Sequence, residues 1–394
     1  MIKEAEEDTI KDTAKGTTKS AAKNTMEEQR MYACWLDTGL WLDRRIKHML
    51  LRAAGTPKEI YAMTDGRADA QLAALVGEKN RDRLKEHRRQ HPEQIWDKMS
   101  RSGIQYTFCK ATDFPERLTN IPDPPFGLFY KGELPAAQAP SVAVIGARKC
   151  SEYGRYMAEH ITEGLVRYGV DIISGMAMGI DGISQRKALK SGGRSYGVLG
   201  CGADVIYPPS NEPLYRMLLA EGGVLSEYPP QTAPRAALFP PRNRIISALA
   251  DAVLVIEARE KSGTFITVDM ALEQGREVYA VPGRCTDELS VGCNKLLRQG
   301  AGVAISAEDI MDDMGWERAA AGEKAAAGRT ETVSLLGRAV YDALQRGTLM
   351  TQEELVLALR MKGDDTPVAQ ICGALVELQL NHLIEKTGGA YRRR

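Results

Sequence analysis

The spacing of apolar and polar residues changes along the chain. Residues 1–30 carry mostly Lys, Glu, Asp, Thr and Ala, with few large apolar side chains. Such a segment buries too little surface to offset its ordering entropy, so we expect a disordered tail. In residues 31–102 the large apolar residues recur at helical spacing, as at Trp35, Leu36 and Leu40. This spacing predicts a small helical domain.

The middle of the chain, residues 103–312, alternates short β-branched apolar runs with helix-length stretches. Runs of this kind are typical of buried parallel strands that are joined by crossover helices. We therefore predict an α/β fold with a Rossmann-like, doubly wound, mostly parallel sheet. The predicted strands are Val142–Ile145, Asp171–Ile173, Ser195–Leu199, Gly223–Leu225, Ala252–Ile256, Glu277–Val281 and Gly302–Ile305.

The remaining part of the chain has a different texture. Residues 313–330 mix Ala, Gly and charged residues, which predicts a linker. In residues 331–394 we expect three short helices, of which the second begins at a capping box formed by Thr351 and Glu354. Alternating residues around Gly388-Gly389 then indicate a tight hairpin. A helix–turn–helix followed by a hairpin predicts a C-terminal winged helix.

Composition limits the function classes. Lys plus Arg (52) equals Asp plus Glu (52), so any polyanion site must be a local cluster. The seven Cys residues include no C-x-x-C pair, which disfavours a disulfide framework or a zinc site and favours a reducing compartment. The N-terminus does not resemble a signal peptide, and no apolar run is long enough to span a membrane. We expect a soluble, cytoplasmic protein with no membrane span.

The five His residues all lie outside the predicted strand-end loops. Neither a Ser/His nucleophile nor a His metal cluster is therefore expected at the sheet edge, and we predict no catalytic residue and no metal site. His48, His87 and His91 are expected to be surface residues of the helical domain.

The first predicted strand runs into Gly146, Ala147 and Arg148. Arg148 stands where a dinucleotide-binding loop has its second glycine, and the next strand ends in Ser174 and Gly175 rather than in an acid that could hold a ribose. We therefore expect no NAD, FAD or other cofactor. Gly146 alone fits a simple tight turn, whereas an arginine beside free N–H groups at a helix start forms a phosphate cradle.

A second cluster contains Phe239, Arg242, Asn243 and Arg244. The arginines can bind phosphates and the ring can stack on a base. The alternative is a solvated, charged helix start with Phe239 in the core. The pair Pro240-Pro241 is expected to keep the segment of Phe239 out of a regular helix.

A third candidate is the loop formed by Lys261, Ser262, Gly263 and Thr264, which precedes a predicted helix. It suits an anion site at a helix N-terminus, and ordinary capping is an equal alternative. Asp181 is expected to cap the helix after the second strand, and the role of Asp204 stays open. Several such loops on one sheet edge favour an extended polyanion groove.

Six motifs in this order resemble those of the DNA-processing protein A (DprA/Smf) family, over roughly residues 124–301. They are Pro124-Pro-x3-Phe129-Tyr-Lys-Gly132, Val144-Ile-Gly-Ala-Arg148, Ser174-Gly-x3-Gly179-Ile-Asp181, Gly200-Cys-Gly202-x-Asp204-x3-Pro208, Phe239-Pro-x-Arg242-Asn-Arg244-Ile-Ile-Ser247 and Gly275-Arg-x-Val-x-Ala-Val-Pro-Gly283. The helical segment, SAM-like or helix-hairpin-helix-like, and the winged helix also resemble accessory domains of that family.

The resemblance implies a non-enzymatic, dimeric protein that binds and protects incoming single-stranded DNA in natural transformation and loads RecA recombinase onto it. The DNA-binding residues it implies are Gly146, Ala147, Arg148, Ser174, Gly175, Phe239, Arg242, Asn243, Arg244, Lys261, Ser262, Gly263 and Thr264. The chain departs from the family pattern where Met178 replaces an arginine, Ser184-Gln185 replaces Ala-His and Thr264 replaces a serine.

Two alternatives come from other classes. Phosphoribohydrolases that resemble lysine decarboxylases share this Rossmann variant and carry the motif P-G-G-x-G-T-x-x-E. In the present chain, Thr267 stands at the position of the glutamate, so the evident catalytic acid or base of those enzymes is missing. The other alternative is a winged-helix regulator whose core senses a nucleotide. Its recognition helix, residues 367–380, carries neither Arg nor Lys and is poorly equipped to read bases.

Overall fold

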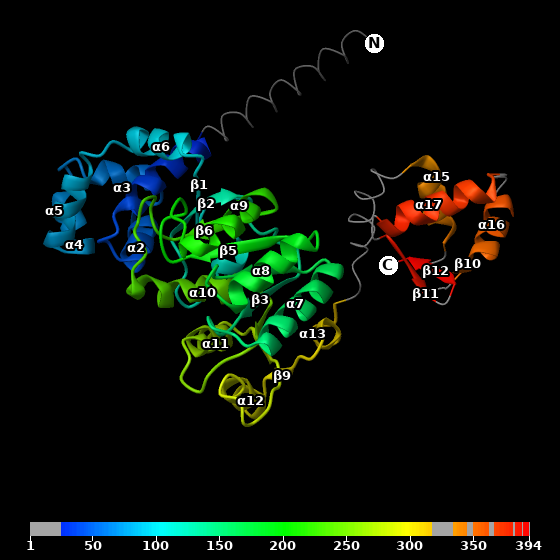
Figure 1. Cartoon of the computed structure of the whole chain (residues 1–394). Helices are drawn as coiled ribbons and strands as arrows, with labels where there is room; N and C mark the ends of the chain where they lie inside the picture. Colours follow the sequence, from blue (N-terminus) through cyan, green and yellow to red (C-terminus); the bar gives the residue numbers. More distant parts are fainter. Residues whose placement is uncertain are drawn as a thin grey trace, which may run out of the picture. The chain divides into compact units, whose positions relative to one another are not determined.

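The computed structural model describes residues 25–316, 334–344, 350–361, 366–380, 383–387 and 389–393. The chain divides into two compact units, residues 1–317 and 318–394. Figure 1 shows the elements of both. The expected tail extends too far, because residues 25–30 belong to a helix that continues to residue 38. Arg30 on this helix forms an ion pair of 2.7 Å with Asp113, which attaches it to the rest of the first unit.

A nine-stranded sheet organises the first unit, in the order β1-β2-β6-β5-β4-β3-β7-β8-β9. All seven strands predicted from the sequence form, with ends that differ by at most two residues, and neighbours among them pair in parallel. These strands are β3 (Ser141–Ile145), β4 (Asp171–Ser174), β5 (Ser195–Leu199), β6 (Gly222–Ser226), β7 (Ala252–Val255), β8 (Glu277–Ala280) and β9 (Gly302–Val303).

Two strands of this sheet were not predicted. β1 (Gln105–Phe108) pairs with β2 (Gly127–Gly132), and β2 in turn pairs with β6, both in antiparallel fashion. Their sequences lack both the long β-branched run of a central strand and clear apolar–polar alternation. The contacts of β2 with β6, nearly a hundred residues away in the chain, define this edge of the sheet.

Helices cover both faces of the sheet, as the alternation of side chains along the strands requires. Along β3, Val142 and Val144 pack under one helical layer, and Ala143 and Ile145 under the other. The first layer contains α7 (Glu152–Arg167), α8 (Ile180–Lys190) and α13 (Ala307–Asp313), which lie side by side in Figure 1. The second contains α10 (Phe239–Leu249), α11 (Thr264–Glu273) and α12 (Val291–Arg298). A further helix, α9 (Glu212–Ala220), packs beside α8 and β6.

The helical segment packs on the edge of this sheet. Trp35 and Leu50 share one apolar core with Tyr106 of β1 and Phe129 of β2. The helices are α2 (Arg44–Ala54), α3 (Pro57–Met63), α4 (Asp69–Val76), α5 (Glu78–His87) and α6 (Pro92–Arg101). Because this core is continuous with the sheet, the helices and the α/β core form one compact unit.

Two of the histidines expected at the surface are not there. His87 is buried, and its Nε2 lies 2.9 Å from the carbonyl oxygen of Trp35. His48 is half-buried, with Nε2 at 3.2 Å from the carbonyl oxygen of Pro124. Burial lowers the pKa of both imidazoles. His91 is exposed.

The second unit contains α15 (Leu335–Ala343), β10 (Met350–Thr351), α16 (Gln352–Met361), α17 (Val368–Leu380), β11 (Ile384–Thr387) and β12 (Ala390–Arg393). Its three strands pair in the order β10-β12-β11. The capping box predicted at the start of α16 is present, since the Thr351 N–H donates to Glu354 at 2.7 Å and the Glu354 N–H donates to Thr351 at 3.3 Å. Helices and hairpin follow the expected order, and the winged-helix assignment stays a prediction. Most of the expected linker lies outside the described residues.

Candidate nucleic-acid interface

The chain order of the sheet reverses between β3 and β7, so the loops that follow these strands meet at a topological switch point, where open α/β sheets bind ligands. In this protein, a side chain of the protein itself occupies the position at the start of α7. Glu257 is buried and accepts hydrogen bonds from the Ser151 N–H at 2.9 Å and the Ser151 hydroxyl at 2.5 Å. Ser151 caps α7. A carboxylate of the protein therefore occupies the helix start that would hold a dinucleotide phosphate.

The first two candidate loops lie against each other at this edge. Gly179, at φ +76°, permits the contact, because a Cβ there would collide with the carbonyl oxygen of Ala147. The N–H of Ile180 donates to that same oxygen at 3.2 Å. The hydroxyl of Ser174 donates to the carbonyl of Val144 at 2.7 Å. The structure therefore joins the loop of residues 146–148 to the loop that begins at Ser174 and Gly175.

Arg148, in the first loop, is exposed. The charge of Arg148 contributes to lowering the pKa of Arg242, although burial is the main cause. The two arginines differ in their access to a ligand, because Arg148 is exposed and Arg242 is buried. Arg148 can meet a phosphate directly.

Arg242 is a structural arginine. It is 6% exposed, and its NH1 group donates to the carbonyl of Gly175 at 3.0 Å and to that of Val198 at the end of β5. Its Nε donates to the side chain of Asn243, which is half-buried. Burial lowers the pKa of Arg242 to about 10, and the nearby Asp181 opposes this effect. Arg242 connects the second loop to the end of a neighbouring strand.

Asp181 does not cap α8, contrary to the expectation. The N-cap is Gly179, and Asp181 lies inside the helix, buried, where it accepts a hydrogen bond from the Gly175 N–H at 3.2 Å. Burial raises the pKa of Asp181, and the charge of Arg242 opposes the rise. Asp204 is also structural, because it accepts from the backbone N–H of Gln231 at 2.8 Å.

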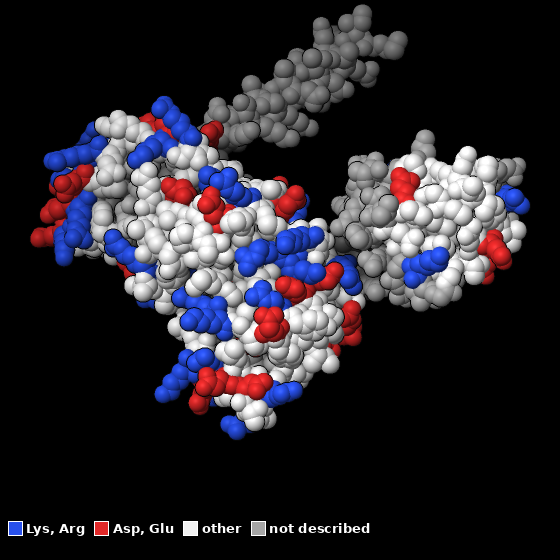
Figure 2. All heavy atoms as spheres, in the orientation of Figure 1, with Lys and Arg blue, Asp and Glu red and all other residues white. Residues whose placement is uncertain are grey.

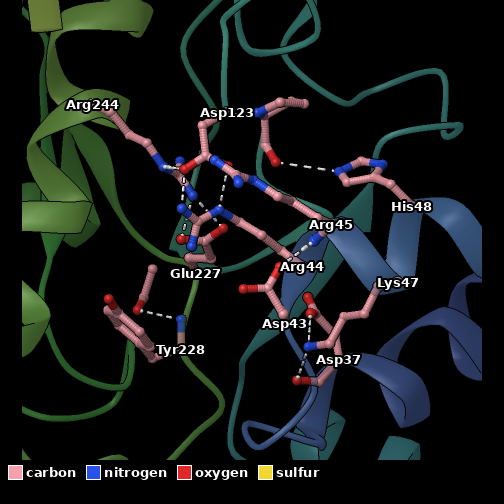
Figure 3. Close-up of polar contacts among 12 residues, drawn as sticks. Asp37, Asp43, Arg44, Arg45, Lys47, His48, Asp123, Glu227, Tyr228 and Arg244 are labelled. Atoms are coloured by element: carbon pink, nitrogen blue, oxygen red, sulfur yellow. Dashed lines mark hydrogen bonds and ion pairs between the residues drawn. The ribbon is translucent and has the colours of Figure 1, made fainter. Parts of the chain in front are cut away.

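Arg244 is buried as well, and its partners are acidic (Figure 3). Its NH2 group lies 2.5 and 2.6 Å from the carboxylate oxygens of Glu227, and its Nε lies 3.3 Å from Asp123. Asp123 also accepts from Arg44 of α2, with Nε at 2.7 Å. Because Arg242 and Arg244 are both buried, the alternative of a solvated, charged helix start is wrong for these two side chains. Arg244 links the core to the helical segment through Asp123.

Phe239 begins α10 instead of lying outside it, because Pro240 and Pro241 occupy the first turn, where no N–H is needed. Its ring is half-buried and rests on Gly200, where a Cβ would come within 2.7 Å of the ring. The guanidinium of Arg242 lies 5.8 Å from the ring centroid. Within the described residues, Phe239 belongs to none of the buried core clusters.

Tyr207 was not singled out from the sequence and lies beside Phe239. The two ring centroids are 5.5 Å apart, with planes inclined by 36°, and Tyr207 is 39% exposed. The loop after β5 carries Tyr207 and the α10 start carries Phe239, so the pair arises from tertiary structure. The only sequence signal for Tyr207 is its place in the Gly200–Pro208 motif.

The loop of Lys261 to Thr264 faces another part of the surface. Together with α11 and α12 it lines a hollow of about 530 Å³, to which Lys261, Asp269 and Lys295 contribute. No residue of the other candidate loops lines this hollow. The N–H of Thr264 donates to the hydroxyl of Ser262 at 3.2 Å, but the N-cap residue of α11 is Gly263, which has no side chain to accept a hydrogen bond. The side-chain capping that was the alternative interpretation of this loop is therefore not found at the start of α11.

Charge on the surface is local, as the balanced composition requires. In Figure 2, Lys and Arg side chains gather over α8 on the face shown, with Asp and Glu interspersed. Among the described residues, no group of three or more His, Cys, Asp or Glu is arranged to hold a metal ion. In the same residues, no helix is long and apolar enough to cross a membrane.

The sheet, its switch point and its loops define a Rossmann-like α/β protein with an exposed arginine and two aromatic rings at one edge of the sheet. Residues 105–315 match the family model described as DNA recombination-mediator protein A. The chain belongs to this family.

Named relatives agree with this assignment. The chain is 40% identical over 230 residues to DNA processing protein DprA of Bacillus subtilis, and this match covers 56% of this chain and 77% of that protein. It is 43% identical over 198 residues to DNA processing protein DprA of Streptococcus pneumoniae, and this match covers 50% of this chain and 70% of that protein. The X-ray structure of DNA processing protein A from Streptococcus pneumoniae covers 71% of this chain and 95% of its own, with a TM-score of 0.61 and 33% identity.

Proposed function

We propose that this protein binds single-stranded DNA across the carboxyl edge of its sheet and acts as a recombination mediator in the cytoplasm. In this role it protects incoming DNA during natural transformation and loads RecA recombinase onto that DNA. The family description and the names of the relatives support a DNA-processing role. In this proposal the protein is a homodimer with no catalytic function.

The observation that carries the proposal is an exposed arginine and a partly exposed aromatic pair on loops at the same edge of the sheet. Arg148 is exposed, and its loop packs against the loop of Gly175 and Gly179. Arg242 bonds to the carbonyl of Gly175 in that second loop, and its guanidinium lies 5.8 Å from the ring centroid of Phe239. Tyr207 extends the aromatic surface beside Phe239. A cation that binds a phosphate and rings that stack on bases are the two components of sequence-tolerant single-strand binding.

Single strands are favoured over duplex because stacking on a side chain needs the face of an unpaired base. In a duplex these faces are covered by neighbouring base pairs, so the rings of Phe239 and Tyr207 would lose their contacts. A duplex retains the phosphate contacts, and we therefore expect weaker binding rather than none.

The candidate residues take different parts in this proposal. Arg148, with the backbone of Gly146 and Ala147, contacts phosphate, and Phe239 and Tyr207 stack on bases. Ser174, Gly175, Arg242, Asn243 and Arg244 hold the loops in place, as their contacts within the protein support. In the loop from Lys261 to Thr264, the residues Lys261, Ser262 and Gly263 line a separate hollow, and this loop provides a more distant contact for the DNA strand.

Fluorescence anisotropy with a labelled oligonucleotide tests the proposal. The full chain is titrated with one single strand and with the duplex of the same sequence, at several salt concentrations. We expect tighter binding of the single strand and an affinity that falls as salt rises, because phosphate contacts release counterions. Equal affinity for both forms, or turnover of a nucleotide substrate in a parallel assay, would contradict it.

RecA loading needs its own assay. RecA assembly is followed on a single strand that is already covered by a single-strand-binding protein, with and without this chain. We expect the lag before assembly to shorten, and to shorten less with Arg148→Ala. An unchanged lag at saturating protein would contradict the RecA-loading part of the proposal and would leave the DNA-binding part standing.

A further inference from the structure

Three Phe, Tyr or Trp side chains are exposed in the part of the chain that the structure describes. One of them is Tyr207 of the proposed DNA interface. The other two, Tyr153 and Tyr156, are 44% and 61% exposed and lie on the first two turns of α7. A large aromatic ring that the protein itself does not cover is a candidate contact for a ligand.

Each of the two rings on α7 is held by a neighbour. The hydroxyl of Tyr153 donates to the carbonyl of Pro282 at 2.7 Å. The ring of Tyr156 stacks on that of His160, one turn further along the helix, with centroids 5.6 Å apart and planes inclined by 6°. A side chain that is already fixed loses less conformational entropy when a ligand binds, so both rings are suited to a stacking contact.

The position of α7 continues the proposed interface on its other side. Arg148 lies in the loop after β3, which leads directly into α7, and β3 lies between β5 and β8 in the sheet. The ring of Phe239 rests on Gly200 after β5, whereas Tyr153 reaches the carbonyl of Pro282 after β8. Along the carboxyl edge of the sheet, the exposed arginine therefore lies between two sets of aromatic rings.

The charge of this segment suits a polyanion. Residues 148–156 hold three exposed cations, Arg148, Lys149 and Arg155, and a single acid, Glu152. Glu152 lies 3.7 Å from Arg155, so its charge is partly offset. The segment is therefore basic, although the chain as a whole is neutral, and such a local excess of cations attracts phosphate groups.

We propose that Tyr153 and Tyr156 form a second base-stacking platform, so that a strand bound at Arg148 continues onto the first two turns of α7. The inference rests on the proposed binding of single-stranded DNA and adds a contact site to it. The ligand of the platform is an unpaired base, because the face of a tyrosine ring stacks on any base without reading the sequence. Glu159 on the next turn is acidic, and we expect the strand to leave the helix there.

The dependence of affinity on strand length tests the platform in the full chain. Oligothymidylates of increasing length are titrated against the parent and against the double variant Tyr153→Leu/Tyr156→Leu. We expect both proteins to bind the shortest strands equally. With longer strands the affinity of the parent should rise further and exceed that of the variant by about tenfold or more, because only the parent stacks the additional bases. Equal affinities at every length overturn the proposal.

Fluorescence of 2-aminopurine locates the stacked bases. The probe is placed at each position in turn of the shortest strand that gives full affinity, whose register is fixed because it must reach both sets of rings. We expect two groups of quenched positions, because the probe is quenched where it stacks on a ring. Quenching of one group should disappear in Tyr207→Ala, and quenching of the other in Tyr156→Leu.

Two controls separate stacking from a general effect on the fold. Tyr153→Phe/Tyr156→Phe keeps both rings and should retain the length dependence of the parent. Leu40→Ala shortens a side chain that is 53% exposed on the helical segment, and it should also behave as the parent does. The melting temperature is measured for every variant, and if the double leucine variant is unstable, Tyr156→Leu alone is compared with Tyr156→Phe.

The measurements distinguish a failure of this inference from a failure of the proposed function. If quenching is lost in Tyr207→Ala and no quenched position responds to the substitutions on α7, the second platform is excluded and the first interface stands. The exposed rings of α7 would then be left for a partner other than DNA. A parent protein that binds no single strand overturns both proposals.

Discussion

The NH2 group of Arg244 contacts both carboxylate oxygens of Glu227, at 2.5 and 2.6 Å, in a site where Arg244 is 4% exposed. Asp123 approaches the same guanidinium at 3.3 Å and reaches Arg44 of the helical segment. This network belongs to the junction between the helical segment and the sheet, although Arg244 lies within a motif that also carries Phe239.

Arg244→Ala is therefore expected to destabilise the fold. The substitution leaves Glu227 partly buried without its cation, which typically costs about 3–5 kcal/mol of unfolding free energy. Urea unfolding measures the loss. Glu227→Gln, which keeps the shape and removes the charge, should cost less. A normal stability of Arg244→Ala with a flattened salt dependence of DNA binding would contradict this role and make Arg244 a direct phosphate contact.

Arg148→Ala is expected to weaken DNA binding without lowering the stability of the fold. The side chain is exposed, so stability should be unchanged, while affinity for single-stranded DNA falls and the slope of log K against log salt decreases by roughly one unit or less. Arg52→Ala is the matched control, because Arg52 is an exposed arginine on α2. Equal effects of the two variants would mean that Arg148 contributes only general charge.

Tyr207→Ala and Phe239→Ala test the aromatic pair. If each ring stacks on a base, each substitution should weaken single-strand binding by about tenfold, since stacking contributes about 1–3 kcal/mol per base. The melting temperature of Tyr207→Ala should stay near normal because the ring is 39% exposed. Quenching of a 2-aminopurine base in the oligonucleotide reports the contact directly. Unchanged quenching in both variants would exclude stacking at this position.

Gly179→Ala tests the contact between the first two loops. The added Cβ would meet the carbonyl oxygen of Ala147 at a residue with φ +76°, so we expect both lower stability and weaker DNA binding. Gly275→Ala is the matched control, with φ +66° and open space around the Cβ position. Its cost should be that of backbone strain alone, about 1 kcal/mol. DNA binding that is lost equally in both variants would refute the loop contact as the cause.

Asp171 at the start of β4 predicts a pH effect on stability. Burial raises the pKa of this carboxyl from 3.8 to about 6, so the folded state holds the proton more tightly than the unfolded state. The resulting stabilisation is complete below pH 3.8 and is lost as the pH rises through about 6. At about 1.4 kcal/mol per pKa unit, the loss approaches about 3 kcal/mol.

Asp171→Asn should remove this dependence. Its stability relative to the parent should rise between pH 4 and pH 7, in contrast to a residue that is needed as an anion. Thermal unfolding at several pH values measures the difference. A parallel pH profile for parent and variant would show that Asp171 does not titrate in this range.

Local sequence was enough for the central elements. The β-branched runs of the parallel strands are apolar on both sides because helices cover both faces, and this leaves a signal in the sequence itself. Caps such as Thr56 at the start of α3 and Thr351 at the start of α16 are equally local, since each depends on residues three positions apart. Edge strands such as β2 carry a weaker signal, because their partner is distant in the chain.

The sequence by itself determined the α/β class, the order of the parallel strands along the chain and the motifs that resemble one family. It also identified Arg148 and Phe239 as candidates from residue type and position. Only the tertiary structure decided which side chains are free. Arg148, Arg242 and Arg244 are the same residue type in similar motifs, yet the last two are buried among carbonyls and carboxylates from other segments. The exposure and the partners of a side chain depend on which residues of distant segments pack against it, as for Tyr207 beside Phe239. No local sequence pattern contains that information.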